Sequence, residues 1–256
     1  MASDRTTTTR RGRTSARAAA LSPDSIIAKA LELLEQSKTA DLSMRRLGEE
    51  MGVDATAFYR HFRDKDDLIL AVWDRVMGEQ IDVLRQLPAD LGWRERLKAM
   101  AMTAWTRAER HPVLYSQCFA RVTGGRHERE LVESILSTLS ATGLDRAETV
   151  LYYRVFADAL LGGCATMTSV LALEPDVREK DATAWSRIYA VLPQEEYPAA
   201  RAHGTELAGI DETVIFETMM ESVLDRIGIA IERVRASGRD RADEETQHRA
   251  AAPEQD

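Results

Sequence analysis

The 256-residue chain has few of the residues that build metal sites, disulfide frameworks or membrane spans. Only two cysteines are present, Cys118 and Cys164, and they lie far apart. This usage fits a reducing compartment and argues against both a disulfide framework and a zinc site. The five histidines show no spacing typical of metal ligands. No apolar run approaches the roughly 18 residues that a membrane-spanning helix needs. Residues 1–20 lack an apolar segment, so we expect no secretory signal.

Motifs of the common enzyme classes are also missing. The sequence contains no phosphate loop, no G-x-G-x-x-G, no H-E-x-x-H and no G-x-S-x-G. An enzyme built on this chain would have to assemble its site from side chains that are distant in sequence. We therefore expect a protein that is not an enzyme and uses no metal or other cofactor, and we keep a helical enzyme as an alternative.

Charge is distributed unevenly along the chain. Residues 1–20 carry five arginines and one aspartate, a net of +4, and subtracting this from the total of −8 leaves −12 for the rest. A basic end on an acidic body suits a protein that contacts a polyanion through one end only. We expect this arm to be disordered when free. It either enters a minor groove or supplies only non-specific attraction, and we favour the second. Its C-terminal arginines are Arg10, Arg11, Arg13 and Arg17.

Helical patterns dominate the rest of the chain, and strand patterns are nearly absent. Four helix starts are marked by residues whose side-chain oxygens cap helix N-termini, namely Ser22, Ser43, Asp54 and Asp64. The helices that follow them are predicted over residues 23–36, 44–51, 55–62 and 65–85. Gly52 accepts the positive φ of a sharp turn between the second and third helices. Pro88 and Gly92 then break the chain.

Further helices are predicted over residues 93–110, 112–122, 127–142, 145–173, 181–191 and 212–236. Residues 192–210 hold two prolines and two glycines and are predicted to form a long loop that is either mobile or functional. We expect four segments: a disordered arm over 1–20, a helix-turn-helix domain over 21–66, a larger helical domain over 67–237 and a disordered tail over 238–256. The fourth helix serves both domains.

The stretch LGEEMGVDATAFYRHFRDK, Leu47 to Lys65, combines an apolar cluster with a polar face. Phe58 and Phe62 are four residues apart and share one side of the third helix. They are predicted to bury together with Leu42, Leu47, Met51 and Val53. The opposite side presents Ala55, Thr56, Tyr59, Arg60 and Arg63. A major groove admits such a helix, whose leading residues reach the base edges. The alternative is an ordinary amphipathic hairpin with a solvated face.

The run VDATAFYRHFRDKDDLI, after SMRRLGEEMG, closely resembles the N-terminal signature of tetracycline-repressor (TetR) family regulators. That signature has an apolar residue, Tyr-x-His/Tyr-Phe, two residues and Lys, then an apolar helix start. The matching positions are Phe58, Tyr59, His61, Phe62, Lys65 and Leu68. The resemblance covers about residues 22–75, and beyond them only the layout of long helices is similar. It implies an all-α fold with an N-terminal three-helix DNA-binding domain and a larger C-terminal helical domain for ligand binding and dimerisation.

The resemblance also implies roles for individual residues. It implies that Ser43 contacts a phosphate and that Arg45 reads a base, bidentate to guanine. Ala55 and Thr56 lie at base edges, and Arg60 reaches a base or a phosphate. Three residues set register on the DNA backbone, namely Tyr59, His61 and Lys65. Alternatively, His61 packs at the edge of the small core and Lys65 pairs with a neighbouring aspartate.

A single helix of this kind reads few base pairs, so we expect a homodimer on a palindromic double-stranded operator. The predicted dimer helices are 145–173 and 212–236, and the alternative is that both are monomer core. The first carries a small-residue stripe, Ala159, Gly163 and Thr166. The second is lined by Ile215, Met219, Val223, Ile227 and Ile231.

A pocket for a small-molecule effector is predicted among the fourth to eighth helices, where large side chains with polar tips gather. The predicted ligand-binding residues are Trp105, His111, Tyr115, Phe119, Tyr152, Phe156 and Met167, and Tyr153 lies beside them. The resemblance implies a cytoplasmic, nucleoid-associated repressor that an effector releases and that needs no membrane. Activation, an effector-independent architectural protein and a protein-docking helical module remain alternatives.

Overall fold

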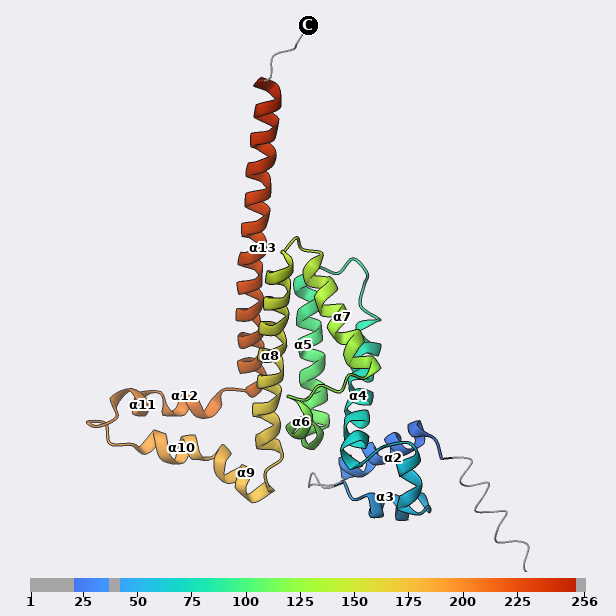
Figure 1. Ribbon diagram of the computed structural model, residues 1–256. Helices are drawn as coiled ribbons and strands as arrows, with labels where there is room; N and C mark the ends of the chain where they lie inside the picture. The colour runs from blue at the N-terminus through green and yellow to red at the C-terminus, as the bar shows by residue number, and fades with distance from the viewer. Residues whose placement is uncertain (1–20, 37–41, 252–256) are drawn as a thin grey trace, which may run out of the picture.

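The computed structural model describes residues 21–36 and 42–251, and over these residues it contains helices, turns and loops but no strand. The predicted all-α class is confirmed. The basic arm over 1–20, including Arg10, Arg11, Arg13 and Arg17, lies outside the described residues, as do residues 252–256. Figure 1 shows a small N-terminal unit beneath a bundle of longer helices, with an arm that projects from the bundle.

The N-terminal unit contains α2 (Pro23–Gln36), α3 (Met44–Met51) and the 3-10 helix η1 (Ala55–Arg60). The Ser43 side chain accepts a hydrogen bond from the Arg46 amide at the start of α3, and Gly52 ends that helix with a φ of 65°. The third helix, predicted over 55–62, is present as the 3-10 helix η1, which Asp54 caps and which ends two residues earlier, at Arg60. A tight turn closes this helix, because the His61 and Phe62 amides both donate to the Phe58 carbonyl oxygen, at 2.9 and 3.0 Å.

The predicted apolar cluster forms the core of this unit. Leu42, Leu47, Phe58 and Phe62 are buried, and Met51 and Val53 are half-buried against them. Gly48 lets α3 approach the turn closely, because a Cβ atom at this position would lie 2.8 Å from the Val53 carbonyl oxygen. The close packing of α3 on η1 therefore depends on a glycine that was not singled out from the sequence.

The fourth helix, α4 (Lys65–Leu84), connects the N-terminal unit to the bundle without a linker. The Asp64 side chain caps it by accepting a hydrogen bond from the Asp67 amide at 2.8 Å. Its buried residues begin with Leu68 and continue to Leu84. The helix packs against α2 near its start and against the bundle further along.

The bundle contains α5 (Trp93–Arg110), α6 (Pro112–Cys118), α7 (Arg126–Ser140), α8 (Arg146–Leu171) and α13 (Glu212–Ala251). α6 ends four residues before its predicted end at 122. α13 continues past its predicted end at 236 and through most of the tail predicted to be disordered, to Ala251. Most residues after Gly238 are good helix formers, and a single glycine lowers helix stability by only about 1 kcal/mol.

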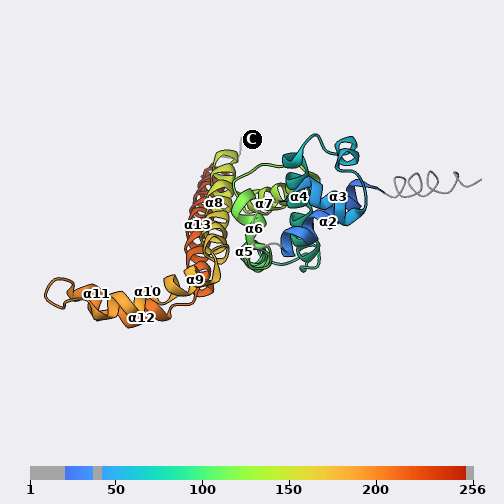
Figure 2. The ribbon, with the colours of Figure 1, turned by 90° about the horizontal axis from the view of Figure 1, so that it is seen from below.

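Residues 175–209 form the projecting arm, a series of short helices: α9 (Pro175–Ala182), α10 (Ala184–Ile188), η2 (Tyr189–Val191), α11 (Pro198–Ala202) and α12 (Gly204–Gly209). The helix predicted over 181–191 is present but is divided among α9, α10 and η2. The loop predicted over 192–210 is wrong, because it contains α11 and α12. α10 packs against α12, and Gly204 permits this because a Cβ atom there would lie 2.8 Å from the Ala190 amide nitrogen. The arm leaves the bundle on the side away from the N-terminal unit (Figure 2).

Several residues predicted to face a dimer partner lie inside the subunit instead. Ile227 and Ile231 are buried in the core. A Cβ atom at Gly163 would lie 2.7 Å from both Phe216 and Met219, so the helix that approaches closely at this glycine is α13 of the same chain. Over the described residues, no single helix is long and apolar enough to cross a membrane. α8 and α9 meet that test only as a pair, bent by 114°.

Candidate nucleic-acid interface and cavities

One side of the N-terminal unit carries the residues predicted to contact DNA. We call it the recognition face, and it comprises Ser43, Arg45, Ala55, Thr56, Tyr59, Arg60, His61 and Lys65. Six of these residues are exposed, whereas Ala55 and Lys65 are half-buried. Because His61 is exposed, the alternative that it packs at the core edge is wrong. The structure therefore leaves six of the eight predicted residues at the surface of α3, η1 and the residues that flank them.

Arg45 lies on this face in an exposed ion pair. Its Nε atom is 3.0 Å from Glu49 Oε1, one helical turn further along α3. An exposed pair at this spacing contributes only about 0.3–0.5 kcal/mol. A bidentate contact with guanine is worth about 1–3 kcal/mol of discrimination. The ion pair with Glu49 is therefore too weak to hold the guanidinium away from a base that accepts two hydrogen bonds.

Thr56 has its hydroxyl already engaged. The hydroxyl donates to Asp54 Oδ1 at 2.6 Å, and the Thr56 amide donates to the same oxygen at 2.8 Å. These two bonds hold the pKa of Asp54 below its usual value, because they stabilise the charged carboxylate. The hydroxyl is thus fixed toward the N-cap, and the methyl group is the part of Thr56 suited to an apolar contact with a thymine methyl.

Two aspartates in the first turn of α4 hold arginines. The Asp67 carboxylate accepts from the Arg63 guanidinium at 3.1 Å, and Asp66 forms a bidentate pair with Arg121 at 2.6 and 2.7 Å. Each pair lowers the pKa of its aspartate, chiefly through the hydrogen bond from the guanidinium. Arg121 follows α6, so the second pair joins the bundle to the residue directly after Lys65 of the recognition face. No local pattern indicates this contact between residues 55 positions apart.

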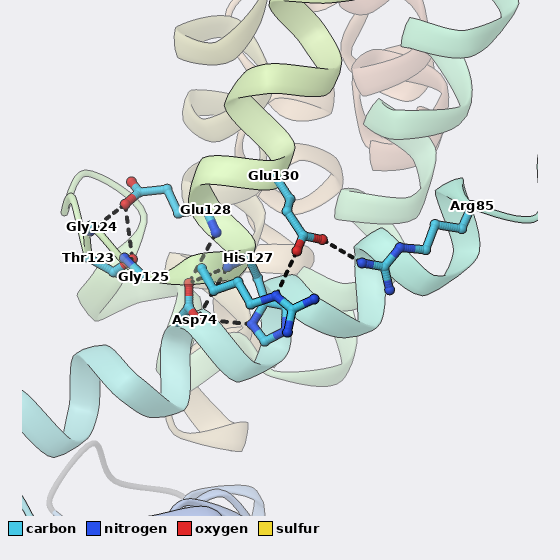
Figure 3. Close-up of polar contacts among 9 residues, drawn as sticks. Asp74, Arg85, Thr123, Gly124, Gly125, His127, Glu128 and Glu130 are labelled. Atoms are coloured by element: carbon cyan, nitrogen blue, oxygen red, sulfur yellow. Dashed lines mark hydrogen bonds and ion pairs between the residues drawn. The ribbon is translucent and has the colours of Figure 1, made fainter.

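A second link joins the middle of α4 to the beginning of α7 (Figure 3). The Asp74 carboxylate accepts hydrogen bonds from the His127 and Glu128 amides, each at 3.1 Å, and lies 2.9 Å from His127 Nδ1. Gly125, directly before α7, makes no side-chain cap of its own. A carboxylate from α4 therefore takes the place of the missing N-cap and is favoured by the helix dipole.

We expect Asp74→Ala to lower the free energy of unfolding by about 1–2 kcal/mol, the range for loss of an N-cap. Asp74→Asn is the matched control, since its side-chain oxygen still accepts an amide hydrogen bond, and it should retain most of the stability. Urea unfolding followed by circular dichroism measures both. Equal losses for the two variants would mean that the charge of Asp74 matters and that its capping bonds do not.

A central cavity of about 120 Å³, partly open to solvent, lies between α4, α5, α6, α7 and α8. Three predicted ligand residues line it, namely Tyr115, Phe119 and Phe156, together with the neighbouring Tyr153. Trp105, Tyr152 and Met167 are instead buried among core side chains, where Trp105 stacks on Phe216 with ring centroids 4.4 Å apart. His111 lines a different cavity, beside α2. The predicted ligand set is therefore divided among three places.

Two family profiles match most of the chain. Residues 26–72 match the family described as bacterial regulatory proteins, tetR family, and residues 87–231 match the tetracyclin repressor-like C-terminal domain. The first match covers α3, η1 and most of α2, and ends within α4. The second covers the bundle, the arm and the first half of α13.

Individual relatives agree with these profiles. The HTH-type transcriptional repressor Rv1353c of Mycobacterium tuberculosis is 27% identical over 219 residues, which span 83% of this chain and 82% of the relative. Among solved structures, SCO7222, a TetR from Streptomyces coelicolor, has a TM-score of 0.67 at 23% identity and covers 82% of this chain and 99% of its own. The S. coelicolor TetR family protein ActR in complex with (S)-DNPA has a TM-score of 0.68 at 21% identity, over 81% and 96% of the two chains. At these identities the two structures show a shared fold.

Proposed function

Because this chain belongs to the tetR family of bacterial regulatory proteins, whose members bind DNA and regulate transcription, we propose that it is a dimeric repressor released from its operator by a small molecule. The recognition face would contact DNA, the outer sides of α8 and α13 would form the dimer, and the central cavity would admit the effector. Within this proposal, residues 21–66 form the DNA-binding domain and residues 67–237 the effector-binding and dimerisation domain, and the repressor acts on the nucleoid in the cytoplasm.

The observation that carries the DNA-binding role is the division of η1 into two sides. Phe58 is fully buried, whereas the next residue, Tyr59, has 55% of its surface exposed. Thr56, Arg60 and His61 are exposed beside Tyr59. A short helix anchored by one aromatic residue and polar on its outer side has the shape and chemistry that major-groove contact needs.

Exposed apolar residues on α8 and α13 support the dimer. Leu151 and Val155 lie one turn apart on α8, and Val214 and Ile229 lie on α13, all exposed. Small exposed residues lie further along the same sides of the two helices, Gly162 and Thr166 on α8 and Thr218 and Ser222 on α13. Both helices lie on the side of the bundle away from the N-terminal unit (Figures 1 and 2). An apolar face of this kind is typical of an isologous interface between two copies of a chain.

The small volume of the central cavity supports release by an effector. Its volume of about 120 Å³ is below the roughly 300–1,000 Å³ of typical small-molecule sites, so the helices must move apart to admit a ligand. An effector would then favour an expanded conformation over the described one, as a population shift requires. Arg121 lines the cavity and also pairs with Asp66. Expansion here would therefore disturb the contact that holds the start of α4.

The base-reading role of Arg45 is tested by Arg45→Ala with Arg46→Ala as the matched control. Both variants remove one exposed positive charge from α3, so both should weaken binding to every sequence. Only Arg45→Ala should also lose about 1–3 kcal/mol of discrimination at one operator position. The operator is first obtained by selection from random DNA, and affinities for each single-base variant are then measured.

An unchanged preference at every position in Arg45→Ala would show that Arg45 contacts only the DNA backbone. The spacing of half-sites in the selected operator also bears on the dimer, since two copies related by a twofold axis require a palindrome. A reporter gene placed behind that operator separates repression from activation, because a repressor lowers its expression.

A further inference from the structure

A second cavity, of about 300 Å³, lies where the N-terminal unit meets the bundle. It is distinct from the central cavity, since no residue lines both. Its walls come from three parts of the chain, and we call it the junction cavity. Its lining includes Leu31, Leu34 and Glu35 of α2, His111 and Val113 at the start of α6, and Leu171, Leu173 and Arg178 at the end of α8 and in α9.

His111 is the buried polar group of this cavity. Its side chain is only 2% exposed, and neither ring nitrogen has a hydrogen-bond partner among the described residues. Glu35 Oε1 lies 3.2 Å from Nδ1 but without hydrogen-bond geometry. A buried polar group without a partner costs about 1–3 kcal/mol. The ring is therefore placed to gain from a partner inside the cavity.

The chemistry of His111 limits what that partner can be. Burial lowers the pKa of His111, which favours the neutral ring with one N–H donor and one acceptor nitrogen. A small rotation would let Nδ1–H donate to Glu35 and would leave Nε2 as an acceptor. A ligand that satisfies the ring must then supply an O–H or N–H donor.

The other residues that line the cavity indicate the polarity and net charge of the rest of the ligand. Leucine, valine and proline side chains form most of the wall. The charged residues are two glutamates and two arginines, Glu35, Glu174, Arg110 and Arg178. Their charges cancel, so the cavity favours neither a net anion nor a net cation. A neutral compound with an apolar body matches these walls, and a volume of about 300 Å³ lies at the lower end of typical small-molecule sites.

We propose that the junction cavity is a second small-molecule site, which takes a neutral apolar compound with a hydroxyl donor, such as a phenol, and presents His111 Nε2 as the acceptor. The compound contacts α2 of the N-terminal unit and α6 and α8 of the bundle at once. Its binding therefore strengthens the contact between the two parts in the described arrangement. A compound in the central cavity would not contact the N-terminal unit, because the walls of that cavity come from the bundle and α4 alone.

The probe for this site is 2-naphthol, and 2-methoxynaphthalene is its matched control because it lacks the donor. The full chain is labelled with ¹⁵N-histidine, and the ring nitrogens are followed by NMR during titration. We expect 2-naphthol to shift the His111 Nε2 resonance saturably. The ether should bind about 10-fold more weakly, which corresponds to one hydrogen bond of about 1–1.5 kcal/mol. Equal binding of both compounds, or no shift of His111 with 2-naphthol, overturns the proposal.

Protein variants locate the binding. Leu173→Trp narrows the junction cavity from its exposed edge and should abolish the shift, whereas Val122→Trp, at a residue 81% exposed and outside both cavities, should preserve it. Ala157→Phe, which fills the central cavity, should also leave 2-naphthol binding intact. His111→Phe keeps an aromatic ring without the acceptor nitrogen and should fold. Its binding is measured by isothermal titration calorimetry, because the His111 resonance is absent, and it should lose the preference for 2-naphthol over its ether.

Binding that survives Leu173→Trp, or that Ala157→Phe abolishes, would assign the compound to another place and overturn the proposal. A preference for 2-naphthol that persists in His111→Phe would do the same. The titration contains no DNA, so its outcome does not depend on whether the proposed repressor function holds.

Discussion

Phe58→Ala is expected to lower the free energy of unfolding by about 3–5 kcal/mol, the range for truncating a fully buried phenylalanine. Phe58 has no exposed surface and packs in the core that η1, α2, α3 and α4 share. Its removal leaves a cavity under η1, and the helix then loses its anchor. We expect urea unfolding to begin at much lower denaturant and specific DNA binding to be lost even where the bundle stays folded.

Tyr59→Ala provides the control, because Phe58 and Tyr59 lie in the same helix, η1, and differ in burial. Tyr59 is 55% exposed, so its truncation should change stability by no more than about 0.5 kcal/mol. It should nevertheless weaken binding to all DNA sequences, since a backbone contact carries no sequence information. Similar destabilisation by both substitutions would contradict the orientation of η1 described here.

Leu151→Glu is expected to convert the dimer to a monomer and to weaken operator binding at least about 100-fold. Leu151 is 55% exposed within one subunit, so the substitution should leave the fold intact. In the proposed dimer it would bury one unpaired carboxylate from each subunit at the interface, which is strongly unfavourable. A monomer makes half of the base contacts, and each lost base pair alone is worth about 1–3 kcal/mol. Light scattering after gel filtration and operator titration measure the two effects.

Val122→Glu is the matched control, because it places the same charge at an exposed valine outside α8 and α13. It should remain dimeric and bind the operator as the parent chain does. Ile229→Glu, on the exposed part of α13, should behave like Leu151→Glu. A chain that stays dimeric with both Leu151→Glu and Ile229→Glu would place the interface elsewhere.

The elements that sequence analysis located correctly are those fixed by local interactions. Ser43 and Asp64 cap helices through bonds to amides three residues away, and Gly52 supplies the positive φ that its turn needs. Such signals need no knowledge of the rest of the fold. The predicted length of η1 was wrong because the length of this helix is not set by a local signal. It depends on how the chain continues at both of its ends.

The arm shows where local patterns fail. α10 and α12 are five and six residues long, which is too short for apolar periodicity to indicate a helix. They are stabilised by packing on each other, at a contact that Gly204 permits. The prolines and glycines that suggested a loop instead mark the breaks between short helices.

The lining of the central cavity was predictable by the type of residue and not by the position of each residue in the chain. Phe119 and Trp105 were both predicted to bind a ligand, yet Phe119 lines the central cavity and Trp105 is buried outside it, because the rotation of each helix decides which side chains reach the cavity. Asp74 was missed because it caps a helix that begins 52 residues later. One signal was available: α7 begins after two glycines with no capping side chain of its own, so its cap had to come from elsewhere.

The continuity of α4 has a consequence for engineering hybrid regulators. The predicted domain boundary between residues 66 and 67 lies inside the first turn of this helix, between Asp66, which pairs with Arg121, and Asp67, which pairs with Arg63. A graft joined there would separate Asp66 from Arg121 and Asp67 from Arg63. A transplant of DNA specificity should instead carry all of α4 and join near Pro88, and Asp74 and Arg121 should be matched to their new surroundings.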